Sequence, residues 1–313
     1  MRYSINEVLD EKQCYDYLSK TLHPDGLNCP KGHILPPDQV PQDRHRDPFF
    51  DYRCKICGSV FNIFTDTIWS GSRYSCITIV LIIRGIVQGI PTLHLAEELG
   101  IDRSHLLEIR HNIQKWAEEH LPRSPLPDIN TEADEMYQNA GEKGDEHDDI
   151  DDPPRRRANN KKGIGTMKND RPPILGIVGR ISHKIRITVC DNTQQATIQP
   201  QVEKNTDQKT NLNTDESSAY AHVSETGRKH STVCHSKGEY ARDDDGDGVR
   251  EVHCNTLEGI WTGLRNFLRP FRGIHKKYLS QYTAMFEWAH NLKKAIPEFL
   301  RCLMIPTYTF KPT

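Results

Sequence analysis

Three short acidic motifs, far apart in the sequence, contain residue types that could hold divalent metal ions. They are Glu132-Ala133-Asp134-Glu135, Asn213-Thr214-Asp215-Glu216 and His253-Cys254-Asn255-Thr256-Leu257-Glu258. Two metal ions about 3.5–4 Å apart, clamped by carboxylates, can activate an attacking oxygen and stabilise a leaving oxygen in phosphodiester chemistry. Each motif alone also fits a solvated acidic surface. The motifs therefore indicate metal-dependent phosphodiester chemistry if the fold brings them together.

A second set of residues has the spacing of metal ligands. Cys29 and His33 form one close pair, and Cys54 and Cys57 form another. Two such pairs supply the four ligands of a tetrahedral structural zinc. The surrounding stretch 27–67 has few apolar residues, so a bound metal would supply stability that burial cannot. His45 is a competing fourth ligand, and ordinary buried cysteines beside a surface histidine are the alternative.

The elements that must position these residues follow from hydrophobic patterning. Apolar positions recur at helical spacing in 77–121 and again in 257–303, whereas short β-type runs occupy 174–179 and 185–190, with a third near Thr214. A Pro-rich linker covers 122–128, and a polar, charged stretch at about 140–172 predicts a long inserted loop. The fold class is α/β, with predicted segments 1–70, 71–121 and 122–313.

Residues Thr92–Ile113 have the outline of a helix-turn-helix. An A-x-x-L-G-I segment precedes a polar start at Asp102, and the second helix carries Arg103 and Arg110. A recognition helix presents side chains of this kind to a DNA groove. A plain helical hairpin packed on a core gives the same pattern and remains open at this point.

Composition and charge constrain the compartment and the partners. The net charge is −2, yet acidic and basic residues are segregated along the chain, so basic DNA tracks can coexist with an acidic pocket. Nine cysteines with one C-x-x-C pair, and a first segment without a signal-peptide profile, favour a reducing cytoplasm. The most apolar run, 76–90, is too short to span a bilayer. We expect a soluble cytoplasmic protein with no membrane partner.

Two basic runs are candidates for contacts to DNA phosphates. The first is Arg155, Arg156 and Arg157, and the second is Arg265, Arg269, Arg272 and Lys276. The second run is interleaved with aromatic residues, a combination typical of nucleic-acid surfaces. A solvated charged face is the alternative for either run taken alone.

The acidic run Asp243–Gly248 matches the opening of an EF-hand loop. Position twelve of that loop falls on Cys254, where a bidentate Glu is required, and no flanking helix pair is evident. We therefore expect this run to be a loop that delivers the next helix to the active site, with incidental cation binding as the alternative.

Three longer motifs carry a resemblance to a known family. They are T-D-E-S-S-A-Y, then K-H-S-T-V-C-H-S-K-G-E-Y, then H-C-N-T-L-E-G-I-W-T-G-L-R-N-F-L. The chain resembles bacterial insertion-sequence transposases of the DDE superfamily, in the ISXO-like branch, over nearly its full length and including the zinc ribbon in front. The resemblance implies a ribonuclease-H-like catalytic domain with a mixed sheet, preceded by the zinc ribbon and the helix-turn-helix.

The resemblance also assigns roles to particular residues. Asp134 and Asp215 take the positions of the first two catalytic carboxylates. The third falls on Glu258, with Asn255 as the alternative, because a carboxylate binds a hard divalent ion such as Mg²⁺ or Mn²⁺ better than an amide does. Where the family often has Lys, seven residues after Glu258, this chain has Arg265. Either cation could hold a DNA phosphate, but a guanidinium grips it by a fork.

The expected function is therefore that of an insertion-sequence transposase. It binds the ends of its element and catalyses metal-dependent cleavage and transfer of DNA strands, with structural Zn²⁺ in the ribbon. Synapsis of two DNA ends makes a homo-oligomer the expected state. The competing hypothesis is a zinc-containing DNA-binding regulator, or a transposase remnant without activity.

Overall fold

The structure is a computed structural model that describes residues 10–36, 38–142 and 162–309. The chain divides into two compact units. Residues 1–120 and 292–313 form the first unit, and residues 121–291 form the second.

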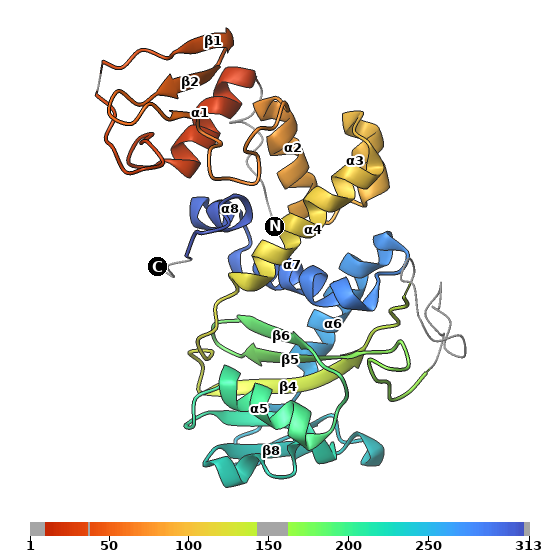
Figure 1. Ribbon diagram of the computed structural model, residues 1–313. Helices are drawn as coiled ribbons and strands as arrows, with labels where there is room; N and C mark the ends of the chain where they lie inside the picture. The colour runs from red at the N-terminus through yellow and green to blue at the C-terminus, as the bar shows by residue number, and fades with distance from the viewer. Residues whose placement is uncertain (1–9, 37, 143–161, 310–313) are drawn as a thin grey trace. The chain divides into compact units, whose positions relative to one another are not determined.

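The first unit combines a small antiparallel sheet with a group of helices (Figure 1). Its strands are β1 (Asp43–Arg46), β2 (Phe49–Arg53) and β3 (Val60–Phe61), and its helices are α1 (Glu11–Leu22), α2 (Cys76–Val87), α3 (Thr92–Leu99), α4 (Arg103–Glu119) and α8 (Pro297–Met304). The Glu11 carboxylate accepts hydrogen bonds from the amides of Cys76 (2.6 Å) and Ile77 (3.1 Å). This contact caps the N-terminus of α2, where amide groups lack helical partners.

Helices α3 and α4 are joined by a short turn, which is the outline that the sequence predicts for a helix-turn-helix or a plain helical hairpin. Gly100 ends α3 in the left-handed region (φ 63°), a conformation that costs glycine little. Asp102 then caps α4, because its carboxylate accepts a hydrogen bond from the amide of His105 (2.9 Å). The turn residues seen in the sequence therefore end one helix and begin the next, as predicted.

The second unit is built on a five-stranded mixed sheet of order β6-β5-β4-β7-β8 (Figure 1). Strand β5 runs antiparallel to its two neighbours β4 and β6, whereas β7 pairs parallel with β4 and β8 pairs parallel with β7. Their bounds are β4 (Asn130–Tyr137), β5 (Pro173–Gly179), β6 (Ile185–Val189), β7 (Asn211–Asp215) and β8 (Lys229–Val233). This order and these directions give the ribonuclease-H-like fold that the family resemblance implies.

Helices cover both faces of this sheet. One face packs on α5 (Gln195–Asn205), through Ile198 and Val202, and the other packs on α6 (Asn255–Leu268) and α7 (Leu279–Leu292). Strand β5 is buried at every residue because it lies between the two layers. The remaining elements are a hairpin of β9 (Ala241–Arg242) and β10 (Val252–His253), and short 3-10 turns η1 (Ser218–Tyr220), η2 (Val223–Thr226), η3 (His235–Lys237), η4 (Arg269–Phe271) and η5 (Lys276–Tyr278).

The compact units differ from the three segments 1–70, 71–121 and 122–313 predicted from the sequence. The ribbon and the helix-turn-helix belong to one unit, and residues 292–313 join it. The reason is that α8 buries its apolar face in that unit, and the amide of Ile68 donates to the carbonyl of Met304 (2.8 Å). The second unit accordingly ends at Asn291.

The predicted loop at about 140–172 lies partly outside the described residues. Its two described ends are held together by Lys276, whose Nζ pairs with the carboxylates of Glu142 and Asp170 and donates to the carbonyl of Met167 (3.3 Å). Asp170 is fully buried and Glu142 is 4% exposed. A buried carboxylate requires such a partner, so Lys276 has a structural role.

Candidate functional site

Asp134 and Asp215 lie on neighbouring parallel strands in matching positions. The pairing of β4 with β7 puts Glu132 opposite Asn213. Two residues further along each strand are Asp134 and Asp215, whose side chains point to the same face because strand side chains alternate. Burial raises the pKa of Asp134, and the charge of Asp215 raises it further. The two predicted carboxylates therefore share one electrostatic site.

Helix α6 covers the sheet at this site. The indole Nε1 of Trp261 donates a hydrogen bond to Oδ2 of Asp134 (2.8 Å). Gly176, which is opposite Asp134 on β5, leaves room for the indole, since a Cβ there would stand 2.4 Å from the ring. The lack of a side chain at Gly176 thus permits the close approach of α6 to Asp134.

Both candidates for the third ligand lie in the first two turns of α6 and are exposed. At about 100° per residue, Glu258 stands about 60° around the helix from Trp261, and Asn255 about 120°. Glu258 is thus the candidate on the side of the helix nearer Asp134. Among the described residues, the ligand atoms of Asp134, Asp215 and Glu258 are not gathered within 4.8 Å of one another.

Glu135, the neighbour of Asp134, points to the opposite face of the sheet. Its carboxylate accepts a hydrogen bond from the hydroxyl of Tyr220, which is fully buried in η1. Burial raises the pKa of Glu135 to about 8, despite that hydrogen bond. Tyr220 follows Asp215 by five residues, so this pair ties the end of β7 to β4 behind the site. The sequence indicated no role for either residue.

His235 acts electrostatically on Asp134, although the sequence assigned it no role. It begins η3, separated from the end of β8 by one residue, and its electrostatic interaction lowers the pKa of Asp134. Glu216 holds the turn, because its carboxylate accepts hydrogen bonds from the amides of His235 (2.8 Å) and Ser236 (3.0 Å). Those bonds lower the pKa of Glu216 to about 2. An acidic residue next to Asp215 therefore positions the adjacent loop.

The four predicted zinc ligands converge in the first unit. The ligand atoms of Cys29, His33, Cys54 and Cys57 all lie within 4.8 Å of one another. The Sγ atoms of Cys29 and Cys57 are 3.5 Å apart, as are Sγ of Cys54 and Nδ1 of His33. Tetrahedral zinc with bonds of about 2.3 Å separates its sulfur ligands by about 3.8 Å, so the cluster fits that ion. His45 is outside the cluster and bonds to Asp43 instead.

The protonation of the cluster also suits a metal. Hydrogen bonds with Ser59 lower the pKa of the Cys57 thiol to about 6, whereas burial raises the pKa of Cys29. The thiolate is the form that binds metal. The hydrogen bonds with Ser59 thus favour the thiolate form of Cys57, which is the form that binds a metal.

The predicted DNA contacts on α4 separate into one exposed and one buried residue. Arg103 is exposed. Arg110 is fully buried, and its guanidinium donates to Oγ1 of Thr92 (2.9 Å) and to the carbonyl of Ile90. The expectation that Arg110 contacts DNA is corrected, because a guanidinium that holds the start of α3 inside the core cannot reach a phosphate.

One residue of the second basic run is also unavailable for DNA contacts. Arg265 in α6, Arg269 at the start of η4 and Arg272 after η4 are exposed. Lys276 is not available, since it pairs with Glu142 and Asp170. Arg155, Arg156 and Arg157 lie outside the described residues.

The acidic loop Asp243–Gly248 joins β9 to β10, which precede α6 directly. Carboxylate oxygens of Asp243, Asp245 and Asp247 lie within 4.8 Å of one another, and Asp243 accepts hydrogen bonds from the amides of Gly246 and Gly248. Flanking strands in place of the helix pair exclude an EF-hand. The loop leads into α6, as the sequence suggested.

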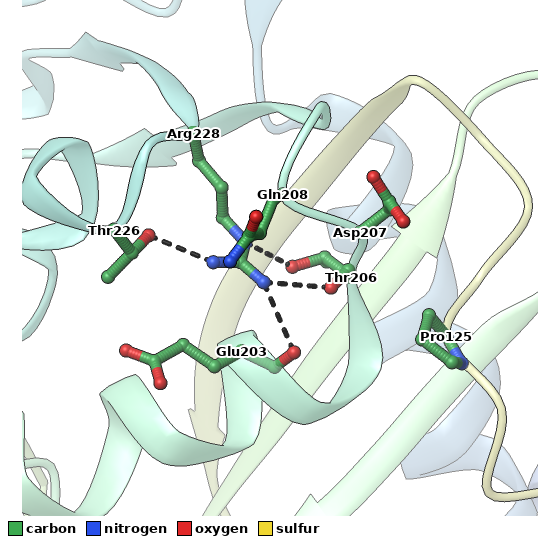
Figure 2. A pocket seen from close by; sticks show the side chains of 7 residues that line it. All are labelled: Pro125, Glu203, Thr206, Asp207, Gln208, Thr226 and Arg228. Carbon is green, nitrogen blue, oxygen red and sulfur yellow. Dashed lines mark hydrogen bonds between the residues drawn. The ribbon is translucent and has the colours of Figure 1, made fainter.

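A cavity of about 570 Å³ lies at the amino ends of β7 and β8 (Figure 2). Arg228 crosses it and donates to Oγ1 of Thr206 (2.9 Å), Oγ1 of Thr226 (2.9 Å) and the carbonyl of Glu203 (3.2 Å) (Figure 2). These hydrogen bonds give the Arg228 guanidinium a structural role. Asp215 ends β7 at the opposite edge, so the cavity is separate from the carboxylate site.

None of the helices among the described residues is long and apolar enough to cross a bilayer.

Comparisons with known proteins identify the family of the second unit. A family model described as the ISXO2-like transposase domain matches residues 126–291. An uncharacterized protein in the transposable element ISH50 of Halobacterium salinarum is 25% identical over 284 residues, which cover 90% of this chain and 92% of that protein.

Two solved structures show weaker likeness. One is a simian T-cell lymphotropic virus intasome in complex with a PP2A regulatory subunit (TM-score 0.29, 13% identity, 67% of each chain). The other is a pre-cleavage Mos1 transpososome (TM-score 0.23, 9% identity, 74% of this chain and 78% of that one). Scores this low carry no functional argument. The family match, in contrast, covers more than half of the chain and includes Asp134, Asp215 and Glu258. The protein therefore belongs to the ISXO2-like transposase family.

Proposed function

We propose that this transposase binds the ends of its insertion sequence and catalyses metal-dependent cleavage and transfer of DNA strands. The observation that carries the proposal is the matching position of Asp134 and Asp215 on adjacent strands, beneath the helix that bears Glu258. A pair of carboxylates with coupled charges suits a divalent cation, which would relieve their mutual repulsion. Oxygen ligands of this kind favour Mg²⁺ or Mn²⁺.

Glu258 is the proposed third ligand, with Asn255 as the alternative. Glu258 lies nearer the Asp134 side of α6, and a carboxylate contributes the charge that an amide lacks. Bound divalent ions would activate the attacking oxygen and stabilise the leaving oxygen. In this proposal Trp261 donates a hydrogen bond to Oδ2 of Asp134, and Oδ1 is the oxygen that would bind a metal ion.

The reaction proceeds in two displacements at phosphorus. In the first, water forms a new bond to the phosphorus at the element end, and the bond to the 3′ oxygen breaks to give a 3′-hydroxyl. In the second, that hydroxyl attacks a phosphodiester of the target DNA and displaces its 3′ oxygen. Positioning and electrostatics suffice for such transfers, so no side-chain nucleophile is needed.

The exposed arginines are the proposed phosphate contacts. Arg265 follows Glu258 by two helical turns and lies on the same side of α6, so it can hold a DNA backbone beside the carboxylates. Arg269 and Arg272 extend this basic surface, and Arg103 belongs to the recognition helix. Arg155, Arg156 and Arg157 remain proposals from the sequence.

The cluster of Cys29, His33, Cys54 and Cys57 is proposed to bind a structural Zn²⁺, on the basis of its ligand set and spacing. A homo-oligomer is the proposed working state, because one reaction joins two element ends. The proposed location is the cytoplasm.

The test is cleavage of a labelled duplex that carries the element's terminal repeats, with Mg²⁺ or Mn²⁺. The wild type is compared with Asp215→Ala, Glu258→Ala and Asn255→Ala, and DNA binding is measured separately. Cleavage by the wild type, with losses in the first two variants and retained binding, supports the proposal. Loss with Asn255→Ala but not Glu258→Ala transfers the third role to Asn255. Binding without metal-dependent cleavage by the wild type favours the DNA-binding regulator or an inactive remnant.

A further inference from the structure

Glu132, two residues before Asp134, is a fully buried carboxylate that grips the start of α6. Its Oε1 accepts hydrogen bonds from Nε of Arg180 (2.9 Å) and Oγ1 of Thr256 (2.8 Å). Its Oε2 accepts from the amides of Thr256 (3.0 Å) and Leu257 (3.4 Å). These amides lie in the first turn of the helix, where no helical acceptor exists for them. The negative charge also opposes the positive end of the helix dipole.

Arg180 extends this grip to the strand that leads into α6. Besides Glu132, its guanidinium donates to the carbonyls of His253 (2.7 Å) and Glu251. The Arg180 side chain is 18% exposed, so the pair with Glu132 is shielded from solvent. The same carboxylate therefore holds both β10 and the first turn of α6, on either side of Cys254.

Strand β4 thus contacts α6 at two points on one face. Glu132 holds the first turn, and Asp134 accepts the hydrogen bond from Trp261 in the second turn. Asn255 and Glu258 lie in the same two turns of the helix. Any shift of α6 along β4 would break one of the two contacts, so together they fix its position relative to the carboxylate strand.

We propose that Glu132 is a positioning residue for catalysis, which sets the distance of the third metal ligand from Asp134 and Asp215 by holding the N-terminus of α6. This inference rests on the proposed function. Glu132 touches neither metal nor DNA in this role. Its effect passes through Thr256 and the helix backbone.

The central variant is Glu132→Gln, which keeps the shape of the side chain but removes its charge and one acceptor. The matched control is Glu287→Gln. Glu287 is also a buried carboxylate of the second unit, 1% exposed, paired with Arg186 (3.3 Å) and accepting from the amide of Ile187 (2.8 Å). It lies on α7, away from the residues assigned to the reaction. A loss of stability common to both variants is therefore separated from an effect on the metal site.

The readouts are Mn²⁺ affinity, from the paramagnetic resonance of free Mn²⁺, and the turnover of cleavage at saturating DNA over a series of metal concentrations. Misplacement of a ligand by about 1 Å costs rates on the order of 10²-fold. We expect Glu132→Gln to lower turnover at least about tenfold and to weaken Mn²⁺ binding, with DNA affinity unchanged. Glu287→Gln should change these values less than about twofold, even where its melting temperature falls equally.

A second pair of variants tests the path through Thr256. Thr256→Val removes the hydroxyl that donates to Glu132, and Thr256→Ser retains it. We expect Thr256→Val to shift metal dependence in the direction of Glu132→Gln, and Thr256→Ser to restore it. Equal metal dependence in Glu132→Gln and Glu287→Gln overturns the positioning role while wild-type cleavage upholds the proposed function. Absence of metal-dependent cleavage in the wild type overturns both.

Discussion

Trp261 and Asp134 are joined by a hydrogen bond of 2.8 Å from the indole Nε1 to Oδ2, which links the helix of the third ligand to the strand of the first. Burial would otherwise favour the neutral form of Asp134, and this bond counteracts the rise in its pKa. The indole therefore helps to keep the carboxylate ionised for a metal. The hydrogen bond occupies Oδ2, so Oδ1 is the oxygen of Asp134 that does not accept from the indole.

Trp261→Phe should weaken the metal site while preserving most of the packing. Loss of one hydrogen bond to a carboxylate costs about 1.5–3 kcal/mol at most. Because the bond lowers the pKa of Asp134, its removal should raise that pKa further. The acidic limb of the cleavage rate against pH should then move to higher pH at subsaturating Mg²⁺. An unshifted limb would show that the indole has a packing role only.

Glu135→Gln should change how stability depends on pH. The pKa of Glu135 is about 8 in the folded protein and 4.5 without the fold. Between these values the unfolded chain loses the proton and the folded chain keeps it, so wild-type stability falls as pH rises. Gln cannot ionise and still accepts from Tyr220. The variant should gain more than about 1 kcal/mol relative to the wild type between pH 5 and 8.

Urea unfolding at several pH values measures this difference. Glu287, whose pKa burial raises to about 7, titrates in the same window but is common to both proteins and cancels. A stability difference that stays constant with pH would contradict a neutral Glu135 in the folded state.

Two arginines of α4 should respond in opposite ways. Arg103→Ala should leave stability nearly unchanged but weaken DNA binding, with the salt dependence of affinity reduced by about one phosphate contact. Arg110→Met should destabilise the first unit by about 2 kcal/mol, because the carbonyl of Ile90 and the hydroxyl of Thr92 lose a buried donor. Thermal unfolding and salt-dependent binding separate the two effects. Equal destabilisation by both variants would contradict this assignment.

Metal analysis should distinguish His33 from His45. The purified wild type and His45→Ala should each contain about one zinc ion per chain, and His33→Ala and Cys57→Ser should contain less. A strong chelator should lower the melting temperature of the wild type to that of Cys57→Ser, since metal binding contributes to folding. Full zinc content in His33→Ala would remove that residue from the ligand set.

The parts of the fold predicted from the sequence depend on local signals. The left-handed Gly100 and the cap at Asp102 are readable in the turn itself, and the zinc ligands form two short pairs. Strands β5 and β6 are apolar runs, so their burial is visible in their composition. Only the family resemblance predicted that Asp134 and Asp215 act together, because neither motif shows how the two strands align.

Strand β4 was not predicted from the sequence because it contains several charged residues. Glu132, Asp134 and Glu135 occur within eight residues, a pattern that resembles a loop. Each charge is compensated by a partner distant in sequence: Arg180, Trp261 and Tyr220 respectively. The prediction that Arg110 contacts DNA was wrong for the same reason. Its hydrogen-bond partners, Ile90 and Thr92, lie about 20 residues earlier, at the start of the preceding helix.

The ion pairs of Lys276 with Glu142 and Asp170, which hold both ends of the charged insertion, have a consequence for protein engineering. Antiparallel β4 and β5 pair through seven residue positions, and the chain between them passes through this clamp before it returns. Because Lys276 holds both ends, a change in the length of the segment between Glu142 and Asp170 should not disturb the pairing of β4 with β5. Closing a longer loop costs little extra entropy. Protein engineers can therefore graft a reporter or an additional binding module between these two residues while the pairing of β4 with β5 is kept.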